Sequence, residues 1–442
     1  MKLSDYIYVL RFNGTSSIIF NGITKKFVVI PQSRVVPYLK LLKKCACDSF
    51  DEPSKGSAFA SKLKVAGFLV ENGLDEREII KNDELSYING NCYQTILIPT
   101  YDCNYSCWYC TQKHRHTQLE ALDIKKIKRH ICSYIFKNQI EAYSLCWFGG
   151  EPLVQKQNVL KITSFLYWWC KRHGVKFMGQ MTTNGALFDE SAIASLRDSH
   201  VNSYQITLDG ARAAHNRVKR EQGGKSSFDI VLHNVRRVLE INVDATVTLR
   251  FNYSKKTLAD HGIVGEICQV IPRSLRDRIV VDLERIWQTQ GVEDIAASDL
   301  YPVLELFSRE GFRLSVGGFF NLCYTEKKHF ETIFYNGKVD FCDNYSEDAA
   351  RGYIDENGDT QWKVVPIFKK EANKQAAVCR NCLYYPVCTG ECPAKRDGRL
   401  TSGVPFTCPK GQKARIEYGI LDYCCRSILN SRNKVEIHED RK

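Results

Sequence analysis

Residues 99–110 read Pro99-Thr-Tyr-Asp-Cys103-Asn-Tyr-Ser-Cys107-Trp-Tyr-Cys110, so three thiols lie within eight residues. The segment follows a predicted strand, YQTILI, which places the thiols on a loop at the carboxyl end of that strand. Three is an informative number, because structural zinc sites close with four ligands, whereas a four-iron cluster held by three cysteines leaves one iron open. The spacing predicts an iron–sulfur site, and a zinc knuckle is the alternative.

Apolar segments alternate with helical patterns on both sides of this loop, from about residue 93 to 310. The predicted strands are YQTILI, SLCWF, VKFMGQM, SYQITL, DATVTLRF and RIVVDLERI, each followed by a plausible helix. Six such units imply a parallel sheet, and curling it into a partial barrel gathers the carboxyl ends of the strands at one mouth. We therefore predict an α/β fold class with a partial (β/α)6 barrel and an active site at that mouth.

Two segments of different texture flank the predicted barrel. The N-terminal one contains short β-rich runs separated by Asn-Gly turns and then helical patterns, which predicts a small α+β module. Its edge strands suit either peptide binding by strand addition or packing against the rest of the chain. The C-terminal segment is rich in Cys, Gly and turns. A segment of this composition needs bound metal clusters, besides an apolar core, to be stable. The predicted domains are residues 1–92, 93–310 and 311–442.

The composition excludes several classes of protein. With 44% hydrophobic and 25% charged residues the chain resembles an ordinary globular protein. No apolar run approaches the roughly 20 residues of a membrane helix, and the first ten residues are too polar for a secretory signal, so we expect a cytoplasmic protein without a membrane partner. The net charge of +12 is spread over 62 basic and 50 acidic residues, without a Lys/Arg block interleaved with aromatics, so we expect no nucleic acid partner.

The 19 cysteines are the most unusual feature of the composition. A reducing cytoplasm disfavours disulfides and leaves metal binding or catalysis as the main reason to keep many thiols. Seven of them fall in one C-terminal set, namely Cys323, Cys342, Cys379, Cys382, Cys388, Cys392 and Cys408. A four-metal site needs only four ligands, so two sites sharing the set is the economical interpretation. Zinc ribbons are the alternative, although the gaps between Cys382, Cys388 and Cys392 fit a zinc knuckle pair poorly.

The CxxxCxxC spacing, with the aromatic Tyr109 before the last cysteine, resembles the defining motif of the radical S-adenosylmethionine (SAM) superfamily. The resemblance implies that Cys103, Cys107 and Cys110 hold a [4Fe-4S] cluster whose open iron chelates SAM. It further implies reductive cleavage of SAM to a 5′-deoxyadenosyl radical, with electrons supplied by a reductant such as flavodoxin or ferredoxin.

A second motif, Gly149-Gly150-Glu151-Pro152, ends the second predicted strand and resembles the GGEP segment of the same family. Glycines let the backbone approach a ligand, and Glu151 is expected to take the ammonium group of the cofactor.

Other predicted strand ends resemble family segments that flank the cofactor. The residues that the resemblance places near SAM are Asn184, Thr207, Lys219, Arg250 and Ile286, together with Tyr109. Thr207 is expected to face the ribose and Ile286 to pack on the adenine. Lys219 is expected to bind the carboxylate, although the family usually has arginine there.

The C-terminal cysteines resemble the SPASM extension of radical SAM enzymes, which binds two auxiliary [4Fe-4S] clusters and brings the total to three. The resemblance implies that Cys323, Cys342 and Cys392 bind the nearer auxiliary cluster. The expected ligands of the outer cluster are Cys379, Cys382, Cys388 and Cys408. Some relatives have an eighth cysteine shortly before the position of Cys323, and this chain has none. The nearer cluster is therefore expected to keep an open iron or to take a distant ligand such as Cys268.

The SPASM resemblance implies a peptide or protein substrate, because most such proteins modify one. Our leading hypothesis is maturation of a ribosomally synthesised peptide by a cross-link or thioether, with the N-terminal module holding the precursor. The alternative is an anaerobic sulfatase-maturating enzyme that makes formylglycine, a group that places its catalytic Asp where Asp343 follows Cys342. A third hypothesis, a noncatalytic electron carrier or peptide-binding scaffold, is disfavoured by the intact triad and GGEP segment.

Overall fold

The computed structural model of the chain divides into two compact units, and each of them is built from segments that are far apart in the sequence. The described residues are 1–47, 55–112, 114–220, 226–289, 295, 297–369 and 377–439. The barrel unit comprises Asn91–Ser315, His329–Val365 and Arg426–Lys442. The cysteine-rich unit comprises Met1–Gly90, Val316–Lys328 and Pro366–Cys425. The predicted division into residues 1–92, 93–310 and 311–442 stays a prediction, and the two compact units are a separate description of the chain.

The barrel unit is organised by six parallel strands in sequential order. They are β6 (Cys92–Ile98), β7 (Ala142–Trp147), β8 (Lys176–Thr183), β9 (Val201–Leu208), β10 (Thr246–Tyr253) and β11 (Ile279–Arg285). Each strand pairs with the next in parallel register, for example Thr207 with Arg250. The carboxyl ends of all six strands therefore lie at the same edge of the sheet. This confirms the predicted α/β fold class with a partial barrel.

The same sheet continues beyond the six predicted strands at both edges. On one side β12 (Arg313–Leu314) pairs in parallel with β11, and on the other β13 (Phe330–Phe334) pairs in parallel with β6. An antiparallel extension follows through β14 (Lys338–Asp340), β15 (Gly352–Ile354) and β16 (Thr360–Trp362). The segment that carries Cys342 is thus part of the sheet that also carries the triad loop, past the predicted boundary at residue 310.

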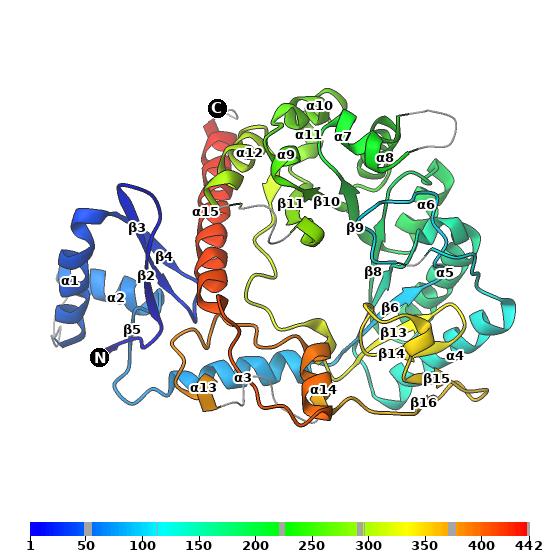
Figure 1. The fold of residues 1–442 in the computed structure, drawn as a ribbon, viewed down its shortest axis with the longest axis horizontal. Helices are drawn as coiled ribbons and strands as arrows, with labels where there is room; N and C mark the ends of the chain where they lie inside the picture. The colour runs from blue at the N-terminus through cyan, green and yellow to red at the C-terminus, as the bar shows by residue number, and fades with distance from the viewer. Residues whose placement is uncertain are drawn as a thin grey trace. The chain divides into compact units, whose positions relative to one another are not determined.

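Helices cover the outer face of the barrel sheet, as α4, α5, α6 and α8 show in Figure 1. The helices and 3-10 turns of this unit are α4 (Ala121–Lys137), η2 (Pro152–Gln155), α5 (Lys156–Arg172), α6 (Glu190–Asp198), α7 (Arg212–Val218), α8 (Ser227–Ile241), α9 (Lys255–Leu258), α10 (Gly262–Val270), α11 (Arg273–Arg276), η3 (Trp287–Thr289), α12 (Ala297–Arg309) and η5 (Glu347–Ala349). Helical spacing of apolar residues explains the packing, since Val231, Val235 and Val238 of α8 are all fully buried. The hydroxyl of Ser226 caps α8 by accepting a hydrogen bond from the amide of Asp229.

The cysteine-rich unit contains the N-terminal elements and most of the C-terminal cysteines. Its strands are β1 (Lys2–Leu3), β2 (Ile7–Arg11), β3 (Ser16–Asn21), β4 (Phe27–Pro31) and β5 (Leu69–Val70). Its helices and turns are η1 (Gln32–Arg34), α1 (Val35–Cys47), α2 (Lys55–Val65), α3 (Glu76–Asn89), η4 (Tyr324–Glu326), η6 (Ile367–Lys369), α13 (Ala377–Arg380), α14 (Pro393–Thr401) and the first half of α15 (Gln412–Glu439). Strands β2, β3 and β4 form an antiparallel sheet with β3 in the middle.

The middle strand β3 is buried on both faces. Ile19 lies in a cluster with apolar side chains of α1 and α2, whereas Phe20 packs in the opposite direction against Phe320 and Tyr423. The hydroxyl of Tyr8 donates a hydrogen bond of 2.7 Å to the carbonyl of Leu383, in the segment between the C-terminal cysteines. The N-terminal sheet and the cysteine segment therefore share one apolar core.

Within the part of the chain that the structure describes, no helix combines the length and the apolar character that a membrane span requires.

Candidate functional site

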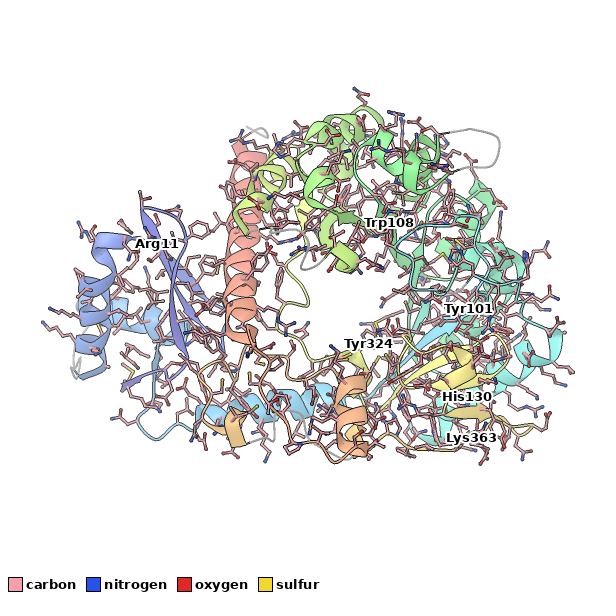
Figure 2. All side chains as sticks on the ribbon, viewed as in Figure 1. Arg11, Tyr101, Trp108, His130, Tyr324 and Lys363 are labelled. Atoms are coloured by element: carbon pink, nitrogen blue, oxygen red, sulfur yellow. The ribbon has the colours of Figure 1, made fainter. Side chains whose placement is uncertain are left out.

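The loop that carries the three thiols starts at the end of β6 and crosses the mouth of the barrel. Figure 2 shows Tyr101, the first labelled residue of this loop, near β6, and Trp108 farther along toward β9. The side chain of Asp102 accepts a hydrogen bond of 2.9 Å from the amide of Cys103, and the amide of Cys110 donates one of 3.0 Å to the carbonyl of Cys107. These bonds fix local turns around the thiols.

The glycines of the GGEP segment lie directly against this loop. The amide of Gly150 donates to the carbonyl of Thr100 at 3.0 Å, and the amide of Glu151 donates to the carbonyl of Asp102 at 2.8 Å. A Cβ atom on Gly150 would lie 2.3 Å from the carbonyl oxygen of Asp102, a distance that heavy atoms do not tolerate. Gly149 adopts a φ of 120°, which favours glycine. Close backbone approach explains both glycines.

The carboxylate of Glu151 is fully buried and is held by protein donors. It accepts hydrogen bonds from the amide of Leu153 at 3.0 Å, the hydroxyl of Thr183 at 2.8 Å and the amide of Asn184 at 2.7 Å. Burial raises the pKa of Glu151, and these donors act against that increase. Glu151 joins the ends of β7 and β8.

Asn184 links the end of β8 to the triad loop. Its side-chain amide donates to the Oδ1 atom of Asn104 at 2.7 Å and to the sulfur of Cys103 at 3.8 Å. The amide of Tyr105 also donates to that sulfur, at 3.4 Å. Donors of this kind favour the thiolate that a metal ligand requires.

Tyr109 anchors the far end of the loop to three other parts of the barrel mouth. Its hydroxyl donates a hydrogen bond to the carboxylate of Asp209, which follows β9, and accepts one of 3.1 Å from the amide of Asn252 in β10. Its carbonyl accepts a hydrogen bond of 2.6 Å from the side chain of Gln288, after β11. The aromatic position of the motif therefore ties the thiol loop to three strand ends.

Lys219 forms a buried ion pair with Asp209. The two side chains are 3% and 2% exposed, and the ammonium group also lies 3.5 Å from the carbonyl oxygen of Thr207. The expected role of Lys219 as the partner of a cofactor carboxylate stays a proposal, and Asp209 is the acidic partner of Lys219 in this structure.

The other expected cofactor residues end β10 and β11 or lie beside them. Arg250 is the register partner of Thr207 on β9 and forms an ion pair of 3.2 Å with Glu284 on β11. Ile286 follows β11, is 8% exposed and donates its amide to the carbonyl of Tyr253 at 3.0 Å. All of these positions lie at the same edge of the sheet as the triad loop.

The chemistry of the donor set fits an iron–sulfur cluster. Three soft thiol ligands lie on one loop, and such ligands suit iron–sulfur clusters. Among the described residues, no three Cys, His, Asp or Glu side chains converge as ligands of a single metal ion. A four-iron cluster binds each thiolate to a different iron, so its ligands do not meet at one point.

Comparison with known proteins agrees with this geometry. The radical SAM superfamily pattern matches residues 97–260 of the chain. Residues 97–260 are a radical SAM domain. The matched region begins within β6 and contains the triad loop, the GGEP segment, Asn184 and Asp209.

Individual relatives of the chain are distant. A GTP 3′,8-cyclase of Synechococcus sp. (strain CC9902) is 26% identical over 216 residues, which are 48% of this chain and 56% of that protein. A cysteine-type anaerobic sulfatase-maturating enzyme of Clostridium novyi (strain NT) is 20% identical over 339 residues, which are 68% of this chain and 88% of that enzyme. The structure of native anSMEcpe, solved with bound AdoMet and the Cp18Cys peptide, aligns with a TM-score of 0.52 at 16% identity, covering 77% of this chain and 99% of that one. That structure and the radical SAM domain share a fold.

Cys342 and Asp343 follow β14 in the sheet that carries the radical SAM domain. Both side chains are partly buried. Burial, and then the nearby carboxylate of Asp343, raise the pKa of Cys146 in β7 to about 12. Asp343 is therefore close to β7, near its carboxyl end.

The cysteine-rich unit contains a cavity of about 650 Å³ beside its cysteines. The cysteines that line it are Cys379, Cys382, Cys388, Cys392 and Cys408. Basic side chains also line it, namely Lys395, Arg396, Arg399, Lys413 and Arg415, together with one acidic residue, Glu391. The sulfur of Cys388 accepts hydrogen bonds from the amide of Gly390 at 3.4 Å and the side chain of Gln412 at 3.6 Å.

Several residues of the mouth lie outside the set that the sequence predicted. Asp102, Asn104, Asp209 and Gln288 all contact the triad loop or belong to it. Asp209 follows the predicted residue Thr207 by two positions, but its partners come from residues 10 and 100 positions away in the chain. No pattern in the sequence indicates such contacts.

Proposed function

We propose that this chain is a radical SAM enzyme that modifies a peptide or protein. The observation that carries the proposal is the attachment of the triad loop to several strand ends at the barrel mouth, through Gly150, Asn184 and Tyr109. Such attachment presents three thiols at a fixed place. Cys103, Cys107 and Cys110 would hold the [4Fe-4S] cluster, which with SAM supplies a carbon-centred radical for hydrogen abstraction.

The neighbouring side chains would then bind SAM. Glu151 keeps one acceptor position for an ammonium group. Thr207 and Arg250 are register partners on adjacent strands, so both reach the same part of the mouth, and Ile286 offers an apolar surface after β11. The family resemblance assigns Thr207 to the ribose, Lys219 to the carboxylate and Ile286 to the adenine of SAM.

The cavity of the cysteine-rich unit supports an auxiliary cluster there. Cys379, Cys382, Cys388 and Cys408 all line it, as the resemblance implies for the outer cluster. The basic residues that line the cavity would stabilise the negative charge of a thiolate-bound cluster.

The nearer auxiliary cluster is proposed on the resemblance and on the ligand types. Cys323 accepts a hydrogen bond of 3.2 Å from the hydroxyl of Thr325, and Cys392 is the N-cap residue immediately before α14. Cys342 follows β14 of the barrel sheet. Cys268 donates to the carboxylate of Glu310 at 3.5 Å, so its thiol has a partner of its own and an open iron is the preferred form of the proposal.

The substrate of the leading proposal is a ribosomally synthesised precursor peptide, in which the enzyme forms a cross-link or thioether. Both faces of the N-terminal sheet are packed, so its edge strands β2 and β4 are the parts available for strand addition. A flavodoxin or ferredoxin would supply the electron.

A second candidate function is formylglycine formation on a sulfatase. It is supported by the similarity to the Clostridium novyi enzyme over 68% of this chain and by the carboxylate of Asp343 near the carboxyl end of β7. In formylglycine formation, Asp343 would accept a proton from the substrate carbon or heteroatom.

The test begins with anaerobically reconstituted protein, dithionite and SAM. Release of 5′-deoxyadenosine is expected, and its absence, with the cluster present, would leave only an electron carrier or scaffold. Two substrates then separate the candidates: a short peptide encoded beside this gene, and a peptide carrying the modified cysteine or serine of a sulfatase. Mass spectrometry should show loss of two hydrogens in the first for a cross-link, whereas an aldehyde in the second supports the alternative.

A further inference from the structure

Asp209 is an enclosed carboxylate beside the thiol loop at the barrel mouth. It is 2% exposed and lies directly after β9. One carboxylate oxygen accepts a hydrogen bond from the hydroxyl of Tyr109, and the other from the ammonium group of Lys219. A buried carboxylate needs such compensation, because removing a charge from water is costly.

The histidine next to this ion pair is neutral. The amide of Asp209 donates a hydrogen bond of 3.3 Å to the Nδ1 atom of His215, which requires an unprotonated nitrogen there. Burial, and then the charge of Lys219, lower the pKa of His215 to about 3. The charge of the group is therefore that of Asp209 and Lys219 alone, and the two cancel.

The ion pair acts on the thiol loop in two ways. Mechanically, Tyr109 is bonded in the chain to Cys110 and is two residues from Cys107, so holding its hydroxyl holds both ligands. Electrostatically, the hydrogen bond from Tyr109 to Asp209 attaches the buried ion pair directly to the loop that carries Cys107 and Cys110. The two charges of the pair act on that loop with opposite signs.

We infer that Asp209 is a positioning residue for the triad loop and that its ion pair with Lys219 sets the reduction potential of the cluster bound there. The inference rests on the proposed function in that Cys103, Cys107 and Cys110 bind the cluster. Reduction adds one negative charge to a cluster, so its potential depends on the net charge and hydrogen bonds around it. A neutral pair adds no net charge beside the cluster, whereas either charge left unpaired shifts the potential of the cluster.

The signs of the shifts follow directly. Asp209→Asn leaves the positive charge of Lys219 uncompensated, which favours the reduced cluster and raises its potential. Lys219→Gln leaves Asp209 negative, which lowers the potential, and Lys219→Arg keeps the charge and should leave the potential near that of the wild type. Tyr109→Phe changes no charge but removes the anchor, so the loop should bind its cluster less tightly, by about 10- to 100-fold as for other residues that orient metal ligands.

The experiment is a redox titration of the full-length, anaerobically reconstituted protein without SAM or substrate, followed by electron paramagnetic resonance. The Cys103→Ala/Cys107→Ala/Cys110→Ala variant supplies the auxiliary cluster signals for subtraction. Asp198→Asn is the control, because that carboxylate is 66% exposed and pairs with Arg197 on the surface. Iron content and chelator challenge report how tightly each variant holds the cluster.

Opposite shifts for Asp209→Asn and Lys219→Gln, with none for the control, support the inference. Unchanged potentials, or shifts in the same direction, overturn it and leave the proposed function standing. Should Asp209→Asn fail to fold, Lys219→Gln and Lys219→Arg still give a decision, because only the first removes a charge. A wild-type protein without any triad-dependent cluster overturns the proposed function and this inference together.

Discussion

The backbone amide of Glu151 donates a hydrogen bond of 2.8 Å to the carbonyl of Asp102, the residue immediately before Cys103. The same glutamate accepts three hydrogen bonds through its side chain, two of them from the end of β8. One residue thus joins the triad loop, the end of β7 and the end of β8. The GGEP segment holds the loop in place in addition to any contact it makes with SAM.

The first prediction concerns Gly150. Its replacement by alanine would place a Cβ atom 2.3 Å from the carbonyl oxygen of Asp102, so the triad loop must move. We expect Gly150→Ala to fold, because the strands beneath the loop are unchanged, but to lose most triad iron and SAM cleavage. Iron analysis and release of 5′-deoxyadenosine measure both losses.

Gly265→Ala is the matched control for Gly150→Ala. Gly265 lies within α10, and a Cβ atom there meets nothing within 4 Å. Alanine is favoured over glycine in a helix by roughly 1 kcal/mol, so this variant should keep its iron and be slightly more stable. Equal iron content in the two variants would contradict the close-approach explanation.

The second prediction concerns Glu151→Gln. The variant keeps the shape of the side chain but replaces an acceptor with an amino group that faces N–H and O–H donors. Leaving buried polar groups unpaired costs about 1–3 kcal/mol each, so we expect lower stability of the protein even without SAM. Urea unfolding of anaerobic, SAM-free protein measures it. Wild-type stability combined with weak SAM binding would instead mean that Glu151 acts only on the ligand.

The strands of the barrel could be predicted from sequence because each is a short apolar run followed by a helical pattern. The position of β13 could not be predicted in this way. Its sequence, FETIF, indicates a strand, but its parallel pairing with β6 depends on a free sheet edge that only the assembled barrel provides. Pairing between segments that are more than 200 residues apart leaves no local signal.

The site shows the same division between local and distant information. The triad and the glycines were predictable, because cluster binding requires fixed spacing and close backbone approach requires glycine. The partners of Asp209 were not, since a carboxylate after a strand has the same sequence pattern whether it faces solvent or is enclosed by Tyr109 and Lys219. Likewise, the sequence context of Lys219 does not reveal its buried ion pair with Asp209.

The third prediction is a pH dependence that originates at the opposite end of the barrel strands. His130 of α4, labelled in Figure 2, lies 2.8 Å from Glu331 of β13, and both are buried. Its other ring nitrogen lies 3.0 Å from the carbonyl of Gly358. Burial alone would lower the pKa of His130 and raise that of Glu331, but their mutual attraction prevails, so the pKa of His130 is raised and that of Glu331 is lowered.

The sign of the effect on stability follows from these directions. The contribution of His130 is fully present below its ordinary pKa of 6.5 and is lost as the pH rises through the raised value. The contribution of Glu331 is fully present above its ordinary pKa of 4.5 and is lost as the pH falls through the lowered value. We expect Glu331→Gln to cost about 3–5 kcal/mol between these two pH values, and less on either side.

Lys137→Ala is the control for this pair. Lys137 also lies on α4 and pairs with Asp359, close to Gly358 in the chain, but both side chains are about half exposed. An exposed ion pair contributes about 0–1 kcal/mol, so this variant should unfold almost as the wild type does. Denaturant unfolding at several pH values compares the two, and a pH-independent cost for Glu331→Gln would show that the pair is not ionic.

The fourth prediction separates the cysteines that bind clusters from those that do not. Cys388 lines the cavity of the cysteine-rich unit and is a proposed ligand of the outer cluster, whereas Cys268 lies on α10 beside Glu310 and Arg276. A chain with three four-iron clusters contains about twelve irons. We expect Cys388→Ala to lose about four of them while the triad still cleaves SAM, and Cys268→Ala to retain all of them. Iron analysis with Mössbauer spectroscopy measures the loss.

Iron loss in Cys268→Ala would identify this thiol as the distant ligand of the nearer cluster. Full iron retention in Cys388→Ala would remove the outer cluster from the proposal.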